Sequence, residues 1–193
     1  MITAIKKRRN IIIFYLIITL IGLTSGYKFY SYQEAKTKQT IIEKIDIKEN
    51  LSYKTNNILN DFKDILKILI YSTLLITLFI NIFNIFYKSF QIGFLFNILN
   101  SLNTKLSIIY LSIYKVVPLI FLIILSNKGI KITKSIISYL LNKKKEHKQN
   151  IILNIKCFIS TSFILISYEF IIFLYSEIIN KYLLTLLNIM WYN

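Results

Sequence analysis

The stretch from Leu106 to Asn127, LSIIYLSIYKVVPLIFLIILSN, decides the fold class of this chain. It contains one charged side chain, Lys115, and one proline, Pro118. An α-helix rises about 1.5 Å per residue, so roughly 20 apolar residues span the hydrocarbon core of a bilayer. The stretch therefore predicts a transmembrane helix. The whole chain is 55% hydrophobic with a mean hydropathy of +0.56, which predicts that this helix is one of several.

Apolar segments occur on both sides of this stretch, and we expect five transmembrane helices in total. They cover residues 11–30, 68–87, 88–105, 106–127 and 151–176. The third of these is short and contains Gln91, Asn97 and Asn100. The predicted fold class is all-α, a polytopic membrane helix bundle formed as a single domain over residues 1–193.

The first apolar segment follows a basic cluster, Lys6-Lys7-Arg8-Arg9, as it would in a signal peptide or in a signal anchor. The small residues that end in Gly26 weakly resemble a cleavage site. A signal anchor is favoured because the segment, extended to Tyr30, is long enough to cross a bilayer. Gly22 and Gly26 form a GxxxG pair, which predicts close packing of this helix against another.

The distribution of lysines predicts the topology. Short loops rich in Lys and Arg remain in the cytoplasm, so the N-terminus and residues 128–150, a predicted basic loop, should both be inside. This arrangement requires residues 88–105 to cross the membrane fully instead of turning back within it. The predicted protein of the cell membrane therefore has a cytoplasmic N-terminus and an extracytoplasmic C-terminus.

Two segments are expected to form helices outside the hydrocarbon core. Residues 31–67 are polar, contain no Pro or Gly, and have isoleucine and leucine at helical spacing, which predicts an extracytoplasmic helical region. Its acidic residues lie among lysines, and we interpret them as a solvated, salt-bridging face. Residues 178–192 carry an apolar stripe and Trp191, which is typical of a helix lying in the membrane interface.

The composition excludes several classes of function. The formal charge of +15 would suit nucleic acid, but apolar runs interrupt each basic cluster, so the bilayer itself is the predicted anionic partner. His147 is the only histidine and Cys157 the only cysteine, so no disulfide, zinc or haem site is expected. No G-x-S-x-G, H-E-x-x-H or P-loop pattern occurs. We expect neither catalytic residues nor a cofactor.

Two charged residues lie inside predicted membrane helices. Lys115 is 13 residues before Lys128, and Glu169 is 13 residues after Lys156, so both lie about 20 Å from the cytoplasmic surface. Opposite charges at equal depth predict an intramembrane ion pair, and the alternative is that both side chains snorkel towards the lipid headgroups. Pro118 lacks an amide hydrogen, which predicts that the carbonyl of Tyr114 is free to accept another hydrogen bond.

The order of segments resembles the stage II sporulation protein M family of bacterial membrane proteins. Three stretches carry the resemblance. Tyr87–Leu95, which includes Lys88 and Gly93, is similar to the family's basic–glycine–aromatic turn, with Ser89 where a glycine is usual. Pro118 lies where the family has a proline, with no polar pair after it. Ser176–Leu184, which includes Glu177, is similar to the acidic C-terminal end of the family, although Glu169 also fits that position.

The resemblance implies a scaffold without enzymatic activity, acting in sporulation and engulfment in spore-forming bacteria. Such a scaffold would recruit peptidoglycan-remodelling partners at the extracytoplasmic face, by resemblance the stage II sporulation proteins D and P. The preference for Ile, Lys, Asn, Phe and Tyr is typical of an AT-rich bacterium. A membrane subunit of a transporter or permease is the main alternative, and a small immunity or stress protein is another. The oligomeric state, including self-association, stays open.

Overall fold

The chain folds into a bundle of long helices. The structure is a computed structural model, and it describes residues 2–44, 55–74, 77–102, 104–143 and 145–188. All regular elements within these residues are helical, so the predicted all-α class is confirmed. The helices are α1 (Ile2–Ser31), α2 (Ala35–Lys44), α4 (Thr55–Thr73), α5 (Thr77–Leu102), α6 (Thr104–Leu111), the π-helix η1 (Ser112–Val116), α7 (Val117–Asn142), α8 (Lys145–Leu174) and α9 (Ser176–Asn188).

Four helical stretches are long and apolar enough to cross a bilayer. They are Ile11–Ser31, Leu78–Ser101, Ser107–Asn142 and Glu146–Leu174. Large apolar side chains point outward from them: Phe79, Phe83 and Phe163 are 76%, 71% and 70% exposed. Soluble proteins rarely expose continuous apolar surface on this scale, whereas lipid tails would cover it. The structure is thus consistent with the predicted multi-pass membrane protein.

The predicted boundary between two spans at Lys88 is wrong. Helix α5 runs without a break from Thr77 to Leu102, and Lys88 lies near its middle. The preceding pass is made by α4, which begins at Thr55 and ends at Thr73. Residues 55–67 therefore belong to a helix packed against α5, α7 and α8, and not to a region outside the bundle. In a sequence, an isolated lysine within an apolar run looks like the end of a membrane helix, because the residue with which it forms an ion pair is not known.

The predicted basic loop at residues 128–150 is also wrong, because most of it is helical. Helix α7 continues to Asn142 and α8 begins at Lys145. The turn includes Lys143, which has a left-handed backbone with φ 49° and ψ 20° and donates its amide to the carbonyl of Tyr139 at 2.7 Å. Lysine is a good helix former, so a run of basic residues does not end a helix as Gly or Pro would.

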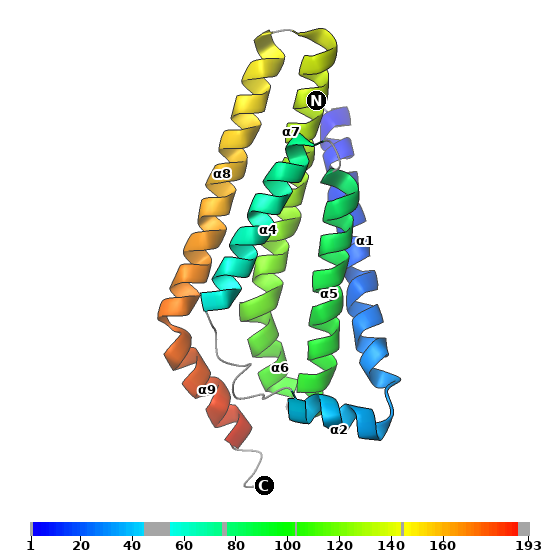
Figure 1. Cartoon of the computed structure of the whole chain (residues 1–193), viewed down its shortest axis with the longest axis vertical. Helices are drawn as coiled ribbons and strands as arrows, with labels where there is room; N and C mark the ends of the chain where they lie inside the picture. Colours follow the sequence, from blue (N-terminus) through cyan, green and yellow to red (C-terminus); the bar gives the residue numbers. More distant parts are fainter. Residues whose placement is uncertain (1, 45–54, 75–76, 103, 144, 189–193) are drawn as a thin grey trace.

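Helices α1 and α5 run in the same direction (Figure 1), and theirs is the most extensive contact between two helices in the described residues. A Cβ atom built on Gly22 would lie 2.7 Å from Ser89 Cβ, and one on Gly26 would lie 2.0 Å from the carbonyl oxygen of Phe90. On α5, a Cβ atom on Gly93 would lie 2.0 Å from the carbonyl oxygen of Leu23. Two small-xxx-small faces thus meet backbone to backbone.

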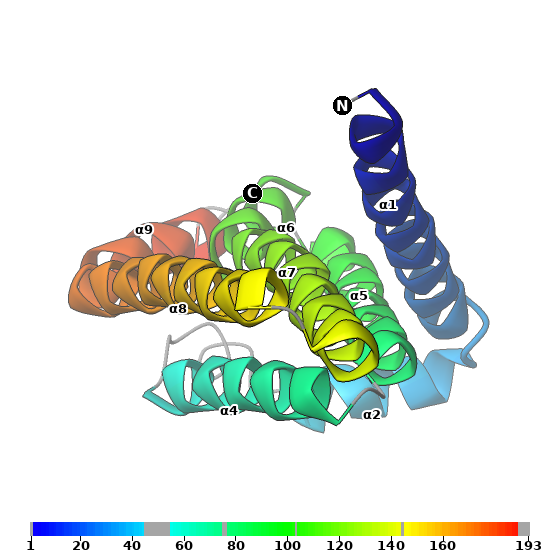
Figure 2. The same cartoon turned by 90° about the horizontal axis from the view of Figure 1, so that it is seen from above.

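Helix α1 begins at one end of the bundle, and the last described helix, α9, lies at the other (Figure 1). Helix α1 starts at the end where α7 turns into α8, and α2 and α9 lie at the opposite end. Figure 2 shows α4 at one side of the bundle, beside α7 and α8. Helix α4 returns the chain between α1 and α5, and it is not among the four stretches that are long and apolar enough to cross a bilayer. Part of the predicted interfacial helix is α9, and residues 189–193 lie outside the described residues.

We predict that Gly26→Ala destabilises the protein by about 1–3 kcal/mol, because the new methyl group meets the backbone of α5 and cannot be accommodated by a rotamer change. Unfolding of the detergent-solubilised protein by a denaturing detergent measures the loss. The control is Leu20→Ala on the same helix, whose side chain is exposed and should matter much less. Equal effects of the two substitutions would contradict the close α1–α5 contact.

Candidate functional site: a charged pocket inside the bundle

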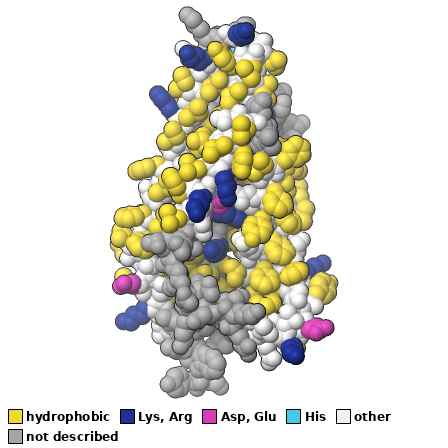
Figure 3. Space-filling model, viewed as in Figure 1, with side chains coloured by type: hydrophobic (Ala, Val, Ile, Leu, Met, Phe, Trp, Pro, Cys, Tyr) yellow, Lys and Arg dark blue, Asp and Glu magenta, His cyan; other side chains and the backbone are white. Residues whose placement is uncertain are grey.

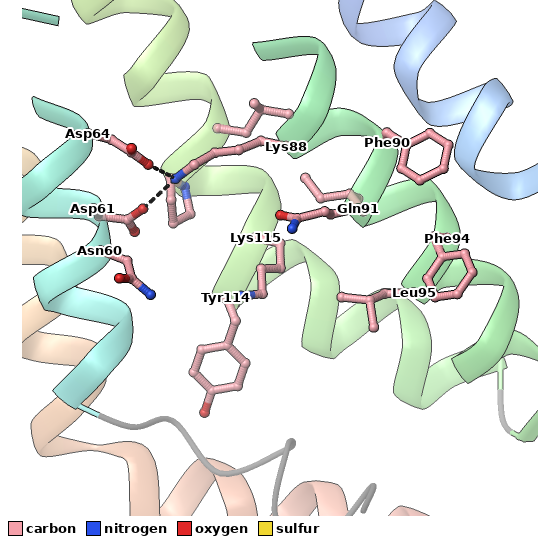
Figure 4. Close-up of a pocket in the computed structure, with 13 residues that line it drawn as sticks. Asn60, Asp61, Asp64, Lys88, Phe90, Gln91, Phe94, Leu95, Tyr114 and Lys115 are labelled. Carbon is pink, nitrogen blue, oxygen red and sulfur yellow. Dashed lines mark hydrogen bonds and ion pairs between the residues drawn. The ribbon is translucent and has the colours of Figure 1, made fainter. Parts of the chain in front are cut away.

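A pocket of about 410 Å³ lies between α4, α5, η1 and the start of α7. Figure 4 shows the side chains that line it, and Figure 3 shows charged groups gathered at the middle of an otherwise apolar face. Lys88 is 10 residues from Leu78 and 13 from Ser101, so it lies about 15–20 Å from each end of the apolar span. In a bilayer centred on this span, the pocket would lie near the middle, where a charge is most costly.

Lys88 is held by two carboxylates from the neighbouring helix. Its Nζ lies 2.7 Å from Asp61 Oδ1 and 2.6 Å from Asp64 Oδ2, and all three side chains are largely buried. Figure 4 shows Lys88 reaching from α5 towards both residues on α4. Lys67 approaches Asp64 at 3.5 Å, but its side chain is 58% exposed, so this contact contributes little. We call Lys88, Asp61 and Asp64 the charge clamp.

The local sequence explains why α4 presents these carboxylates inward. Asp61, Ile65, Ile68 and Ser72 are three or four residues apart, and Asp64 is three residues after Asp61 and four before Ile68, so all five share one helix face. Ile65 and Ile68 are buried in an apolar cluster with residues of α7 and α8. The carbonyl of Ser72 accepts a 2.8 Å hydrogen bond from Thr133 on α7. Apolar packing at one end of α4 thus fixes the carboxylates opposite Lys88.

The pocket wall formed by η1 depends on Pro118. The amide of Val117 donates to the carbonyl of Ser112, five residues earlier, and the next bond in that pattern would run from Pro118 to Ile113. Proline has no amide hydrogen, and the hydroxyl of Tyr168 donates to Ile113 at 2.8 Å instead. The sequence predicted a freed carbonyl at Tyr114; the π-helical register moves the side-chain contact to Ile113.

Lys115 and Glu169 do not form the predicted ion pair. Lys115 lines the pocket, where its charge is attracted by Asp61 and repelled by Lys88. Glu169 on α8 is 2% exposed, and its Oε1 has no hydrogen-bond partner among the described residues. The depths of the two residues match, but residue counting along a helix does not determine which neighbour a side chain faces.

The residues that carried the family resemblance occupy three different places. Lys88 and Pro118 both line the pocket. Gly93 lies at the α1–α5 contact, as do Gly22 and Gly26. Glu177 is exposed in the first turn of α9. The structure therefore brings two of these positions into one site.

Asp61 and Asp64 are the site residues that the sequence analysis missed. They were assigned to a solvated face outside the membrane, and that assignment is wrong. Their spacing with Ile65, Ile68 and Ser72 was the available signal, because it places them on the face that packs. Gln91 and Asn60 also line the pocket.

The site combines paired charges, amides and apolar side chains. The described residues contain no group of three or more His, Cys, Asp or Glu side chains that could hold a metal ion. Comparison with family models, curated proteins and solved structures found no match to this chain.

We predict that Lys88→Met lowers the free energy of unfolding in detergent by about 3–5 kcal/mol, because two buried carboxylates lose the ammonium group that forms an ion pair with both of them. The triple variant that also carries Asp61→Leu and Asp64→Leu should recover much of this loss. Lys67→Met is the control and should change stability by less than about 0.5 kcal/mol.

Unfolding in detergent also tests whether Lys115 and Glu169 interact. The effects of Lys115→Met and Glu169→Leu should add to within about 0.5 kcal/mol in the double variant. If the triple variant Lys88→Met, Asp61→Leu, Asp64→Leu is as unstable as Lys88→Met alone, the ion pairs of the charge clamp do not account for the loss of stability. Recovery in the Lys115–Glu169 double variant would show that these residues are partners.

Proposed function

We propose that the protein is a non-enzymatic scaffold of the cell membrane that holds peptidoglycan-remodelling partners at its extracytoplasmic end. The observation that supports the proposal is the position of α2 and α9. Both lie at the end of the bundle opposite the basic turn between α7 and α8 (Figure 1). Two helices at one end offer a surface outside the bundle on which another protein can be held.

The orientation of the bundle follows from charge. Lys131, Lys134 and Lys143 lie towards the basic end of α7, and the N-terminal cluster of Lys and Arg begins α1 at the same end. The excess of Lys and Arg marks the cytoplasmic side. In this orientation the N-terminus is cytoplasmic, and α2 and α9 are extracytoplasmic.

The chemistry of α9 suits contact with a protein at the membrane surface. Ile178 and Tyr182 are 67% and 56% exposed and lie four residues apart on one face. Glu177 and Lys181, also exposed, are four residues apart beside them. An amphipathic helix of this kind can lie in the interface and still present a mixed surface to a partner. By resemblance, the partners would be the stage II sporulation proteins D and P, or equivalent wall enzymes.

A transporter or permease subunit is the second candidate, because polar groups face inward on several helices. Asn81, Ser126 and Glu169 are each almost fully buried and have side-chain atoms without a hydrogen-bond partner among the described residues. The charged pocket adds to this pattern. Against a continuous path, both carboxylates of the pocket are engaged by Lys88.

Photo-crosslinking in the native membrane distinguishes the two candidates. A photoreactive amino acid at Lys36 on α2 or Tyr182 on α9 should capture a protein with peptidoglycan-cleaving activity, detected in a zymogram of the crosslinked product. The control position is Leu141, exposed near the basic turn. Capture of an ATPase at Leu141, with no wall enzyme captured at Lys36 or Tyr182, would contradict the scaffold and favour a transporter subunit.

A further inference from the structure

We propose that the charged pocket is a binding site for an amphiphilic oxyanion. Its carboxylate or phosphate group would be held by Lys115, and its apolar part would lie against Leu95 and Leu119. The inference rests on the pocket alone and not on the proposed scaffold function.

The two lysines and two aspartates of the pocket balance in number, but Lys115 has no counter-ion at bonding distance. Asp61 and Asp64 both bind Lys88, at 2.7 and 2.6 Å. Lys115 has no ion pair within 4 Å and no hydrogen bond in the described part of the chain, although it lines the same pocket. Figure 4 shows it beside Tyr114 and apart from the clamp. A cation at bilayer depth is costly without a partner, and an anion within reach would remove that cost.

The surrounding side chains specify more than charge. Gln91 and Asn60 contribute amides that can donate hydrogen bonds to an oxyanion. Leu95 and Leu119 form an apolar wall on the α5 and α7 side. A volume of about 410 Å³ is within the range of small-molecule sites. The ligand that satisfies these walls carries one anionic head and a short apolar body.

A cation does not fit the same pocket. The two carboxylates that would attract it already surround the ammonium group of Lys88, and Lys115 would repel it. A neutral apolar ligand would leave the charge of Lys115 unpaired, so the free-energy cost of burying that charge would stay the same. An anion is favoured by position, because Lys115 is the charged residue of the pocket that has no direct ion pair among the described residues.

Octanoate is the probe that tests the proposal, with octanol as the matched uncharged ligand. The full-length protein in phosphatidylcholine nanodiscs is titrated with each ligand while thermal unfolding is followed by circular dichroism. Octanoate should raise Tm in a saturable manner, and octanol should not, because only a ligand of the folded state that pairs with Lys115 shifts the equilibrium. Lys115→Met should weaken the apparent Kd for octanoate at least about tenfold.

Two variants keep the test decisive. Lys115→Arg retains the charge and should bind within about threefold of the unmodified protein, even if Lys115→Met folds poorly. Lys134→Met removes an exposed lysine elsewhere on α7 and should leave the affinity unchanged. Equal Tm shifts for octanoate and octanol, or an octanoate shift that persists in Lys115→Met, would overturn the proposal.

Nanodiscs that contain phosphatidylglycerol identify the source of the anion. If the natural occupant is a lipid headgroup, phosphatidylglycerol alone should raise the Tm of the unmodified protein but not of Lys115→Met, and added octanoate should have no further effect. If the occupant is a soluble organic anion, octanoate should raise Tm equally in both lipid compositions. Either result supports an oxyanion site at Lys115.

Discussion

The ion pairs of Lys88 with Asp61 and Asp64 are the interaction on which the arrangement of the bundle depends. Helix α4 is too polar to enter a bilayer on composition alone, and Lys88 lies at the middle of an otherwise apolar helix. The carboxylates of α4 and the ammonium group of Lys88 would each be costly to bury in a bilayer alone. Their ion pairs lower that cost for both helices. Helix α4 packs against α7 and α8 and pairs its carboxylates with Lys88 of α5, and in this position it returns the chain between the parallel helices α1 and α5. That return places the two basic segments at the same end of the protein.

The close contact of α1 with α5 supplies the second constraint. Gly22, Gly26 and Gly93 allow the two backbones to touch, and Asn97 on α5 donates hydrogen bonds to the carbonyl of Tyr27 and the hydroxyl of Ser31 on α1. Helix α5 is thus fixed on one side by backbone packing and on the other by the charge clamp. The charged pocket opens on the side of α5 that faces α4, where the requirement to pair charges leaves space instead of close apolar packing.

The sequence predicted those parts of the fold that local patterns determine. Apolar segments of sufficient length identified the membrane class and the all-α fold, and the spacing of Gly22 and Gly26 indicated a close helix contact. The position of α4 was not predictable in this way, because Asp61 and Lys88 are 27 residues apart and their pairing is a tertiary contact. Without that contact, Lys88 resembles the end of a span. Lys115 and Glu169 failed as a pair for a related reason: matched depth says nothing about which helix faces each side chain.

The depth of α4 in the membrane is the central claim, and a nitroxide at residue 62 measures it most directly. Phe62 is on α4 beside Asp61 and is partly exposed. A single cysteine there, in a Cys157→Ser background, is spin-labelled and reconstituted into liposomes. Its accessibility to oxygen and to a water-soluble nickel complex is then compared with that of a label at Lys36 on α2. The account predicts high oxygen and low nickel accessibility at residue 62, as for a site deep in hydrocarbon, and the reverse at residue 36. Nickel accessibility at residue 62 equal to that at residue 36 would show that α4 lies outside the bilayer and would contradict the account.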